Sequence, residues 1–212
     1  MKRGDVITVS ISDYAFGGKG IAKVETENGE YVIFVENTFP GQIVEARIAK
    51  KRKRYAEAKL IEIIERSEDE KPIDFQEISG GPYIFVPVEI QEKYKKDSTL
   101  EVFRRIGGIT NPNDYFDEFI SSPNHYHYRN KMEYSFSSIE HDIHSGEEKD
   151  DAFALGFKRR GTWWKVETLE KPSGLFDEQW ETLLDELRVL LKNTGLPAWH
   201  PPQKTGFFRH IV

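Results

Sequence analysis

Cationic side chains are the residues of this chain best suited to a chemical task. They gather in one short stretch that holds a single carboxylate, Glu57. The stretch contains Arg47, Lys50, Lys51, Arg52, Lys53, Arg54 and Lys59. Such a run attracts a phosphate backbone, because each neutralised phosphate releases condensed counterions. A solvated turn between two strands is the alternative interpretation.

A second candidate begins at Arg129. Its planar guanidinium fits a phosphate or a base edge, and Asn130 beside it offers a donor and an acceptor on one group. In a sheet, the same two side chains could instead tie a loop to a neighbouring strand. We predict Arg129 as a nucleic-acid or active-site contact, assisted by Asn130 and Lys131.

Other chemistries are less well supported. The chain has no cysteine, which excludes disulfides, thiolate metal sites and thiol catalysis within it. Its six histidines are His125, His127, His141, His144, His200 and His210. The first four could supply nitrogens to a metal, but they flank a polar connector, residues 143–151, that we expect to be mobile. We therefore predict surface histidines and no metal. Walker, G-x-G-x-x-G and G-x-S-x-G motifs do not occur, so we expect no nucleotide cofactor on this chain.

The composition predicts a folded protein. Of the 212 residues, 38% are hydrophobic and 13% aromatic, which is enough to bury a core. No apolar run approaches the ~20 residues of a membrane helix, and residues 1–5 lack the apolar stretch of a signal peptide, so we expect a cytoplasmic protein. The net charge of -6 is uneven, because residues 1–60 carry 11 Lys and Arg against 8 Asp and Glu.

The basic stretch belongs to a segment that alternates like β-structure. Five candidate strands cover residues 6–12, 21–24, 30–35, 42–48 and 56–64. They are separated by turn residues at 17–20, 27–29 and 39–41. Gly18 and Gly20 can take positive φ and let a backbone approach closely. Five short strands with such turns predict a closed barrel of the oligonucleotide-binding type over residues 1–65.

Three pieces of this segment resemble a TRAM domain, an RNA-binding barrel attached to RNA-modifying enzymes. They are Phe-Gly-Gly-Lys-Gly-Ile-Ala at 16–22, Phe-Pro-Gly-Gln at 39–42 and Lys-Arg-Lys-Arg-Tyr-Ala-Glu-Ala at 51–58. In this context RNA contact becomes the favoured interpretation of the basic stretch. The barrel residues predicted to contact RNA are Lys19, Lys51, Arg52, Lys53, Arg54 and Tyr55.

Residues 66–212 predict an α+β domain after a polar linker at 67–72. The pattern indicates a helix at 88–106 and an antiparallel sheet over 126–168 with strands at 128–137, 153–158 and 163–167. A second helix, at 177–193, carries a leucine stripe that we expect to pack in the core.

The sequence Tyr-Arg-Asn-Lys-Met-Glu-Tyr-Ser-Phe at 128–136, with Leu-Gly-Phe-Lys-Arg-Arg at 155–160, resembles the central domain of the RNA (uracil-5-)-methyltransferase family. The resemblance extends over the whole chain. It implies that Arg129, Asn130, Lys131, Lys158 and Arg159 contact RNA.

Many members of that family carry cysteines that bind an iron–sulfur cluster near residues 73–82. The corresponding positions here hold Ile73, Ser79 and Pro82, with Lys171 at the distant fourth one. None of these side chains replaces a thiolate, so we predict no iron–sulfur cluster.

In this family a cysteine thiolate adds to C6 of a flipped-out uracil, and C5 then attacks the methyl group of S-adenosylmethionine. The chain stops at Val212 in what looks like mid-strand, so we expect it to lack the catalytic domain, which would act in cis or in trans. No catalytic or cofactor-binding residue is predicted, and the chain alone should be inactive. The expected role is recognition of rRNA or tRNA. The alternatives are a non-catalytic RNA-binding or ribosome-associated protein, and a protein scaffold that binds through its acidic second domain.

Overall fold

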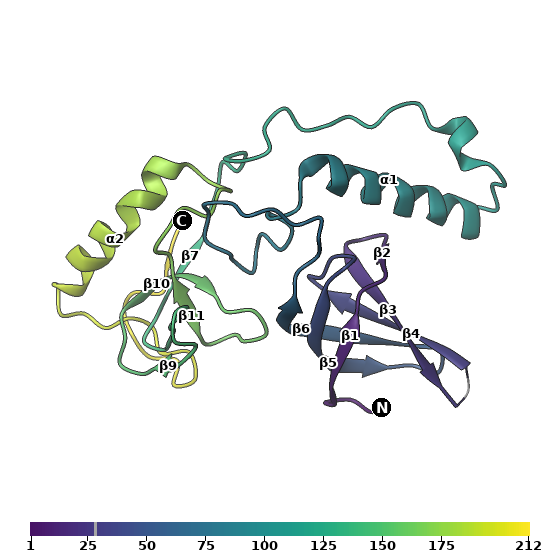
Figure 1. The fold of residues 1–212 in the computed structure, drawn as a ribbon. Coiled ribbons are helices and arrows are strands. Elements are labelled where there is room, and N and C mark those ends of the chain that lie inside the picture. The colour runs from purple at the N-terminus through teal and green to yellow at the C-terminus, as the bar shows by residue number, and fades with distance from the viewer. Residues whose placement is uncertain (28) are drawn as a thin grey trace. The chain divides into compact units, whose positions relative to one another are not determined.

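The chain forms two compact units in the computed structural model, which describes residues 1–27 and 29–212 (Figure 1). The first unit comprises Met1–Pro72 and Tyr83–Pro123, and the second comprises Ile73–Pro82 and Asn124–Val212. The chain therefore passes from one unit to the other three times. Asn28, in the turn expected at 27–29, lies outside the described residues.

The first unit contains the barrel that the alternation predicts. Its strands are β1 (Val6–Ser10), β2 (Asp13–Ala15), β3 (Lys19–Thr26), β4 (Gly29–Glu36), β5 (Ile43–Lys51) and β6 (Tyr55–Glu65). Their order is β1-β5-β6-β4-β3-β2, and all pairings are antiparallel except β4 with β6. The mostly-β fold class and the oligonucleotide-binding type of barrel are confirmed.

A bend in the first strand closes the barrel. The amide of Ile11 donates to the carbonyl of Gln42 at 2.8 Å, and that of Ser12 donates to the carbonyl of Ile21 at 2.8 Å. Residues 6–15 thus act as one strand whose first half pairs with β5 and whose second half, β2, pairs with β3. The pattern did not predict β2 as a separate strand, because it continues the same segment.

Two glycines let the barrel turn tightly, for different reasons. Gly18 has φ +87°, as expected. Gly20 does not have positive φ, which corrects the prediction. Instead a Cβ at Gly20 would lie 2.2 Å from Oγ1 of Thr38 and 2.7 Å from Cγ2 of Ile11. Gly20 is therefore required by close packing rather than by its backbone conformation.

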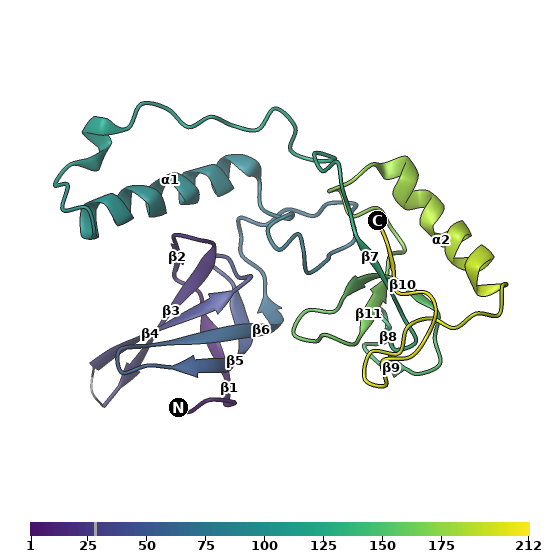
Figure 2. The same cartoon turned by 180° about the vertical axis from the view of Figure 1, so that it is seen from behind.

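The helix α1 (Val88–Arg105) packs on the barrel, over the end where β2 lies (Figures 1 and 2). The ring of Tyr94 lies 6.1 Å from that of Tyr14 and 5.0 Å from that of Phe39. The helix expected at 88–106 is confirmed. Because of these aromatic contacts α1 belongs to the unit of the barrel, whereas the sequence placed the boundary after residue 65.

The second unit is built on another six-stranded sheet. Its elements are β7 (Tyr134–Ser137), β8 (Glu140–His141), β9 (Glu148–Lys149), β10 (Ala154–Lys158), β11 (Val166–Thr168), α2 (Glu178–Lys192) and β12 (His210–Ile211). The strand order is β12-β7-β10-β11-β8-β9. All pairings are antiparallel except a single parallel bridge between β8 and β11.

The strand expected at 128–137 is shorter than predicted. Residues 124–131 are all exposed, and the amides of His127 and Arg129 donate to the carbonyls of Gly174 and Leu175 instead of joining a ladder. The strand expected at 163–167 likewise begins only at Val166. The predicted neighbourhood of the first two strands is confirmed as the pairing of β7 with β10.

The helix α2 is present as expected, but its leucine stripe does not fill the core. Only Glu181 and Leu184 of α2 are buried, while Leu183 is 49% and Leu190 64% exposed. The prediction of core packing is therefore wrong for most of the stripe. α2 is fixed instead by a buried carboxylate, because Glu181 accepts hydrogen bonds from Tyr134 and Ser173.

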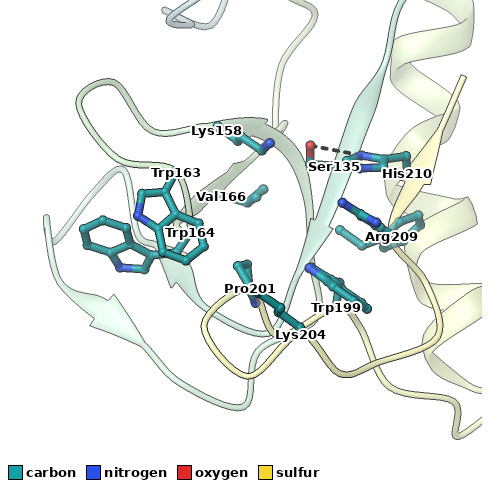
Figure 3. A pocket seen from close by; sticks show the side chains of 11 residues that line it. Ser135, Lys158, Trp163, Trp164, Val166, Trp199, Pro201, Lys204, Arg209 and His210 are labelled. Atoms are coloured by element: carbon teal, nitrogen blue, oxygen red, sulfur yellow. Dashed lines mark hydrogen bonds between the residues drawn. The ribbon is translucent and has the colours of Figure 1, made fainter.

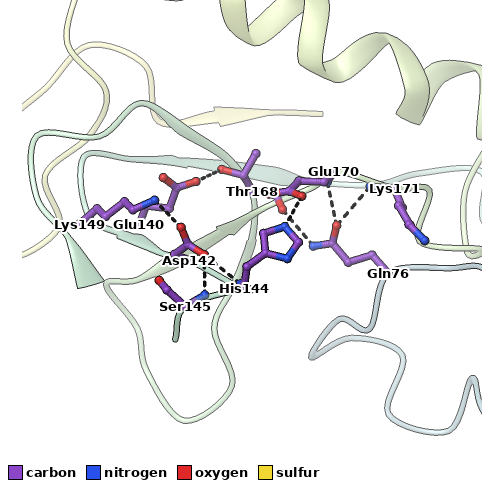
Figure 4. Close-up of polar contacts among 9 residues, drawn as sticks. All are labelled: Gln76, Glu140, Asp142, His144, Ser145, Lys149, Thr168, Glu170 and Lys171. Atoms are coloured by element: carbon purple, nitrogen blue, oxygen red, sulfur yellow. Dashed lines mark hydrogen bonds and ion pairs between the residues drawn. The ribbon is translucent and has the colours of Figure 1, made fainter. Parts of the chain in front are cut away.

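The polar connector expected at 143–151 forms the β8–β9 hairpin (Figure 4). The Asp142 carboxylate accepts from the amides of His144 and Ser145 at 2.8 and 2.9 Å and pairs with Lys149. These contacts hold the pKa of Asp142 well below its usual range, first through Lys149 and then through the two amides.

Residues 73–82 are held to the second unit by a polar contact that we call the Gln76 clasp (Figure 4). The Gln76 side chain is buried. It donates to the carbonyl of Thr168 at 2.9 Å and accepts from the amides of Glu170 and Lys171 at 2.7 and 3.3 Å. Lys171 also pairs with Asp74 at 2.9 Å.

Candidate nucleic-acid interface

The basic stretch forms a tight turn between β5 and β6. The amide of Arg52 donates to the carbonyl of Tyr55 at 2.8 Å, and the Tyr31 hydroxyl lies 2.7 and 2.6 Å from the carbonyl oxygens of these two residues. The turn is therefore anchored to β4 while its tip is exposed. Within the described part of the chain, no carboxylate forms an ion pair with Arg52, Lys53 or Arg54.

Two other predicted barrel cations are already engaged. Lys19 Nζ lies 3.2 Å from the Glu57 carboxylate and 3.7 Å from that of Glu36. Hydrogen bonding and charge from Lys19 lower the pKa of Glu57, with a smaller contribution from Lys50. Lys51 donates to the carbonyl of Met1 at 2.7 Å. The positive charge free for a partner is thus concentrated at residues 52–54.

An aromatic cleft of about 740 Å³ adjoins this turn within the first unit. It is lined by the outer faces of β3 and β4, by α1, by Phe16 in the β2–β3 loop and by Arg54 in the basic turn. Phe34 and Tyr55 line it with their rings edge to face, 5.7 Å apart. Barrels of this type bind oligonucleotides with this face and these two loops.

The sequence did not single out Phe16 or Phe34. Phe16 is 63% exposed, although a large apolar side chain is usually covered. Its position directly before the glycine turn could have identified it, because exposed aromatic rings beside cations are typical of single-strand binding. Phe34 reads as one more apolar residue of a strand, and only the register shows that it faces the cleft.

In the second unit, the predicted contacts gather at one end of two neighbouring strands. Arg129, Asn130 and Lys131 precede β7, and Lys158 ends β10, which runs antiparallel to β7. The first three are exposed, and their side chains have no hydrogen-bond or ion-pair partner among the described residues. Arg159 differs, because it pairs at 2.7 Å with the buried Glu167 and so has a structural role.

The histidines do not converge. Among residues 1–27 and 29–212, no three His, Cys, Asp or Glu side chains are placed to hold a metal ion. His144 is exposed and lies 2.8 Å from the Glu170 carboxylate. His141 is partly buried, contrary to the prediction of surface histidines, and its Nδ1 has no hydrogen-bond partner in the described structure. Nor is any described helix of sufficient length and apolar character to traverse a bilayer.

Comparison with known proteins agrees with the geometry of the barrel. Residues 1–61 match the family model of the TRAM domain. Over its whole length the chain is 31% identical to an uncharacterized RNA methyltransferase of Chlorobaculum tepidum and 31% identical to one of Caldanaerobacter subterraneus. Each alignment covers 100% of this chain and 44% of the relative.

The chain therefore carries a TRAM domain at its N-terminus and is similar throughout to proteins named as RNA methyltransferases. It spans less than half the length of these two relatives.

Proposed function

We propose that this chain is the RNA-binding, substrate-recognition portion of an S-adenosylmethionine-dependent RNA (uracil-5-)-methyltransferase that acts on rRNA or tRNA in the cytoplasm. The observation that carries the proposal is the exposed turn of Arg52, Lys53 and Arg54, without carboxylate partners in the described structure, on a barrel that matches the TRAM domain. Three uncompensated cations at one tip create a local positive potential on a chain of net charge -6.

In this proposal the barrel binds single-stranded RNA by two kinds of contact. The basic turn contacts phosphates, which supplies affinity without reading sequence. The rings of Phe16, Phe34 and Tyr55 offer apolar surface on which unpaired bases stack. A phosphate site next to an aromatic cleft fits an unpaired strand better than a duplex, whose bases are already stacked on one another.

The second unit extends the same surface chemistry toward the target nucleotide. Arg129, Asn130, Lys131 and Lys158 would hold the loop that carries the uridine. The methyl donor and the nucleophile would come from outside this chain, in cis or in trans, because a cysteine thiolate is required and the chain has no cysteine. The proposal includes no iron–sulfur cluster.

The exposed stripe of α2 supports a further partner. Leu183 and Leu190 lie two turns apart on one face, and both are about half exposed or more. A catalytic domain packed on this face would cover them.

Binding of an unstructured RNA to the whole chain, measured over a range of salt concentrations, tests the proposal. The variant Arg52→Gln, Lys53→Gln, Arg54→Gln should bind more weakly, and its dependence of log K on log salt should be shallower by about 2, since each lost phosphate contact removes about 0.7 on a single strand. The matched control, Lys71→Gln, Lys95→Gln, Lys192→Gln, makes the same charge change at exposed positions elsewhere.

If the two triple variants lose affinity equally, net charge rather than the basic turn governs binding. Affinity that does not respond to salt in the wild-type chain would contradict RNA recognition altogether and favour a protein partner.

A further inference from the structure

A pocket in the second unit combines three tryptophans with basic side chains. Its volume is about 340 Å³, near the lower limit of ligand pockets. The side chains that give it this character are Trp163, Trp164, Trp199, Lys158, Lys204 and Arg209. Figure 3 shows Trp163 and Trp164 on one side of the pocket and Trp199 with Arg209 on the other.

The charge of the pocket is opposite to that of the unit that contains it. The second unit has 12 Lys and Arg against 16 Asp and Glu. Nevertheless no carboxylate lines the pocket. Lys158, Lys204 and Arg209 form no ion pair with any described carboxylate. The Arg209 guanidinium lies instead 4.9 Å from the ring centre of Trp199.

The walls of the pocket are fixed by hydrogen bonds. The Ser137 hydroxyl donates to the carbonyl of Trp164 at 3.0 Å, which holds the β10–β11 turn. On the opposite side, the amide of Trp199 donates to the carbonyl of Phe208 at 2.8 Å. A Cβ at Gly206 would lie 2.4 Å from the carbonyl oxygen of Ala198, so this loop is closely packed. The pocket is preorganised rather than formed by loose side chains.

We propose that this pocket binds one unpaired ribonucleotide, with the base stacked on the tryptophans and the 5′-phosphate held by Lys158, Lys204 and Arg209. Aromatic faces take any base, and free cations take the phosphate, so the two halves of the pocket match the two halves of a nucleotide. The volume suits one nucleotide and no duplex. The Ser135 hydroxyl and His210 Nδ1, 3.4 Å apart at the rim, add polar atoms for a base edge.

This inference deepens the proposed function and rests on it for the identity of the ligand as RNA. It concerns a second contact, carried by different residues and different forces. Stacking dominates in the pocket, whereas charge dominates at the basic turn of the barrel. The two contacts therefore respond differently to substitution and to salt.

The first experiment measures binding of an unstructured RNA to the whole chain with single substitutions. Trp163 is 58% exposed, so Trp163→Ala should fold normally. It should weaken binding about 5- to 150-fold with little change in the salt dependence. Trp180→Ala is the matched control, because Trp180 is 38% exposed on α2 and does not line the pocket. Lys204→Gln should make the salt dependence shallower by about 0.7, and Lys192→Gln should not.

The second experiment does not depend on the barrel. Uridine 5′-monophosphate is titrated into the whole chain while the four indole N–H signals are followed by NMR. The signals of Trp163, Trp164 and Trp199 should shift and that of Trp180 should not. Ribose 5-phosphate, which lacks the base, should shift none of them.

The outcomes separate the two proposals. Undiminished RNA affinity of Trp163→Ala, with the basic-turn variant still impaired, overturns the pocket and leaves the proposed function intact. Equal shifts by ribose 5-phosphate, or no shifts at all, also overturn it. Nucleotide-specific shifts in a chain that binds no longer RNA would support the pocket and contradict the proposed function.

Discussion

At the scale of single residues, two nearby histidines have opposite environments. Glu170 accepts a hydrogen bond from His144 and attracts its charge, which raises the pKa of His144. Burial lowers the pKa of His141, and the charge of Arg159 lowers it further. The sequence predicted six equivalent surface histidines, because it shows neither the burial of His141 nor the proximity of Glu170.

The two histidines should therefore titrate separately. Over about pH 5 to 8, proton NMR should show His144 losing its proton above the ordinary value of about 6.5 and His141 below it. The bond of His144 contributes stability at pH below its unfolded pKa, and this is lost as pH rises through the raised folded pKa. For His141 the sign is reversed, and stability is lost as pH falls.

Glu170→Gln should return the pKa of His144 toward the ordinary value and leave that of His141 almost unchanged. A parallel shift of both histidines would indicate that the hairpin had rearranged, and would contradict this assignment.

At the scale of elements, the Gln76 clasp shows what a sequence pattern can and cannot predict. Strands β1 and β3–β6 and both α-helices follow from local periodicity, since their apolar residues recur at two or at three to four positions. The clasp does not, because Gln76 lies 92 residues from Thr168. The same limit applies to the pocket, whose tryptophans meet only when the 198–208 loop packs beside the β10–β11 turn.

Gln76→Ala should destabilise the second unit by about 2 to 4 kcal/mol, because a buried carbonyl and two amides would lose their partner. Urea unfolding followed by tryptophan fluorescence measures this, since all four tryptophans lie in that unit. Gln203→Ala, at an exposed position, is the control and should have little effect. A loss below about 1 kcal/mol would mean that water replaces the clasp.

At the scale of the whole molecule, the triple passage of the chain links the two units. Residues 117–123 are exposed and lie outside helices and strands. A specific protease site inserted between Glu118 and Phe119 should be cut readily. The two fragments should nevertheless elute together in size-exclusion chromatography, because the first fragment contributes residues 73–82 to the second unit.

Addition of Gln76→Ala and Asp74→Ala to the cut protein should weaken that association, whereas Gln203→Ala should not. Separation of the fragments without these substitutions would show that residues 73–82 are held too weakly to join them.

The clasp also sets an order of events during synthesis on the ribosome. The barrel and α1 are complete once Pro123 has emerged, so the first unit can fold while the rest is still being made. Residues 73–82 emerge early but must wait for Thr168, Glu170 and Lys171 before they are paired. For that interval the nascent chain carries a folded unit with an unpaired loop in its middle, and closure of that loop reports that the second unit has formed.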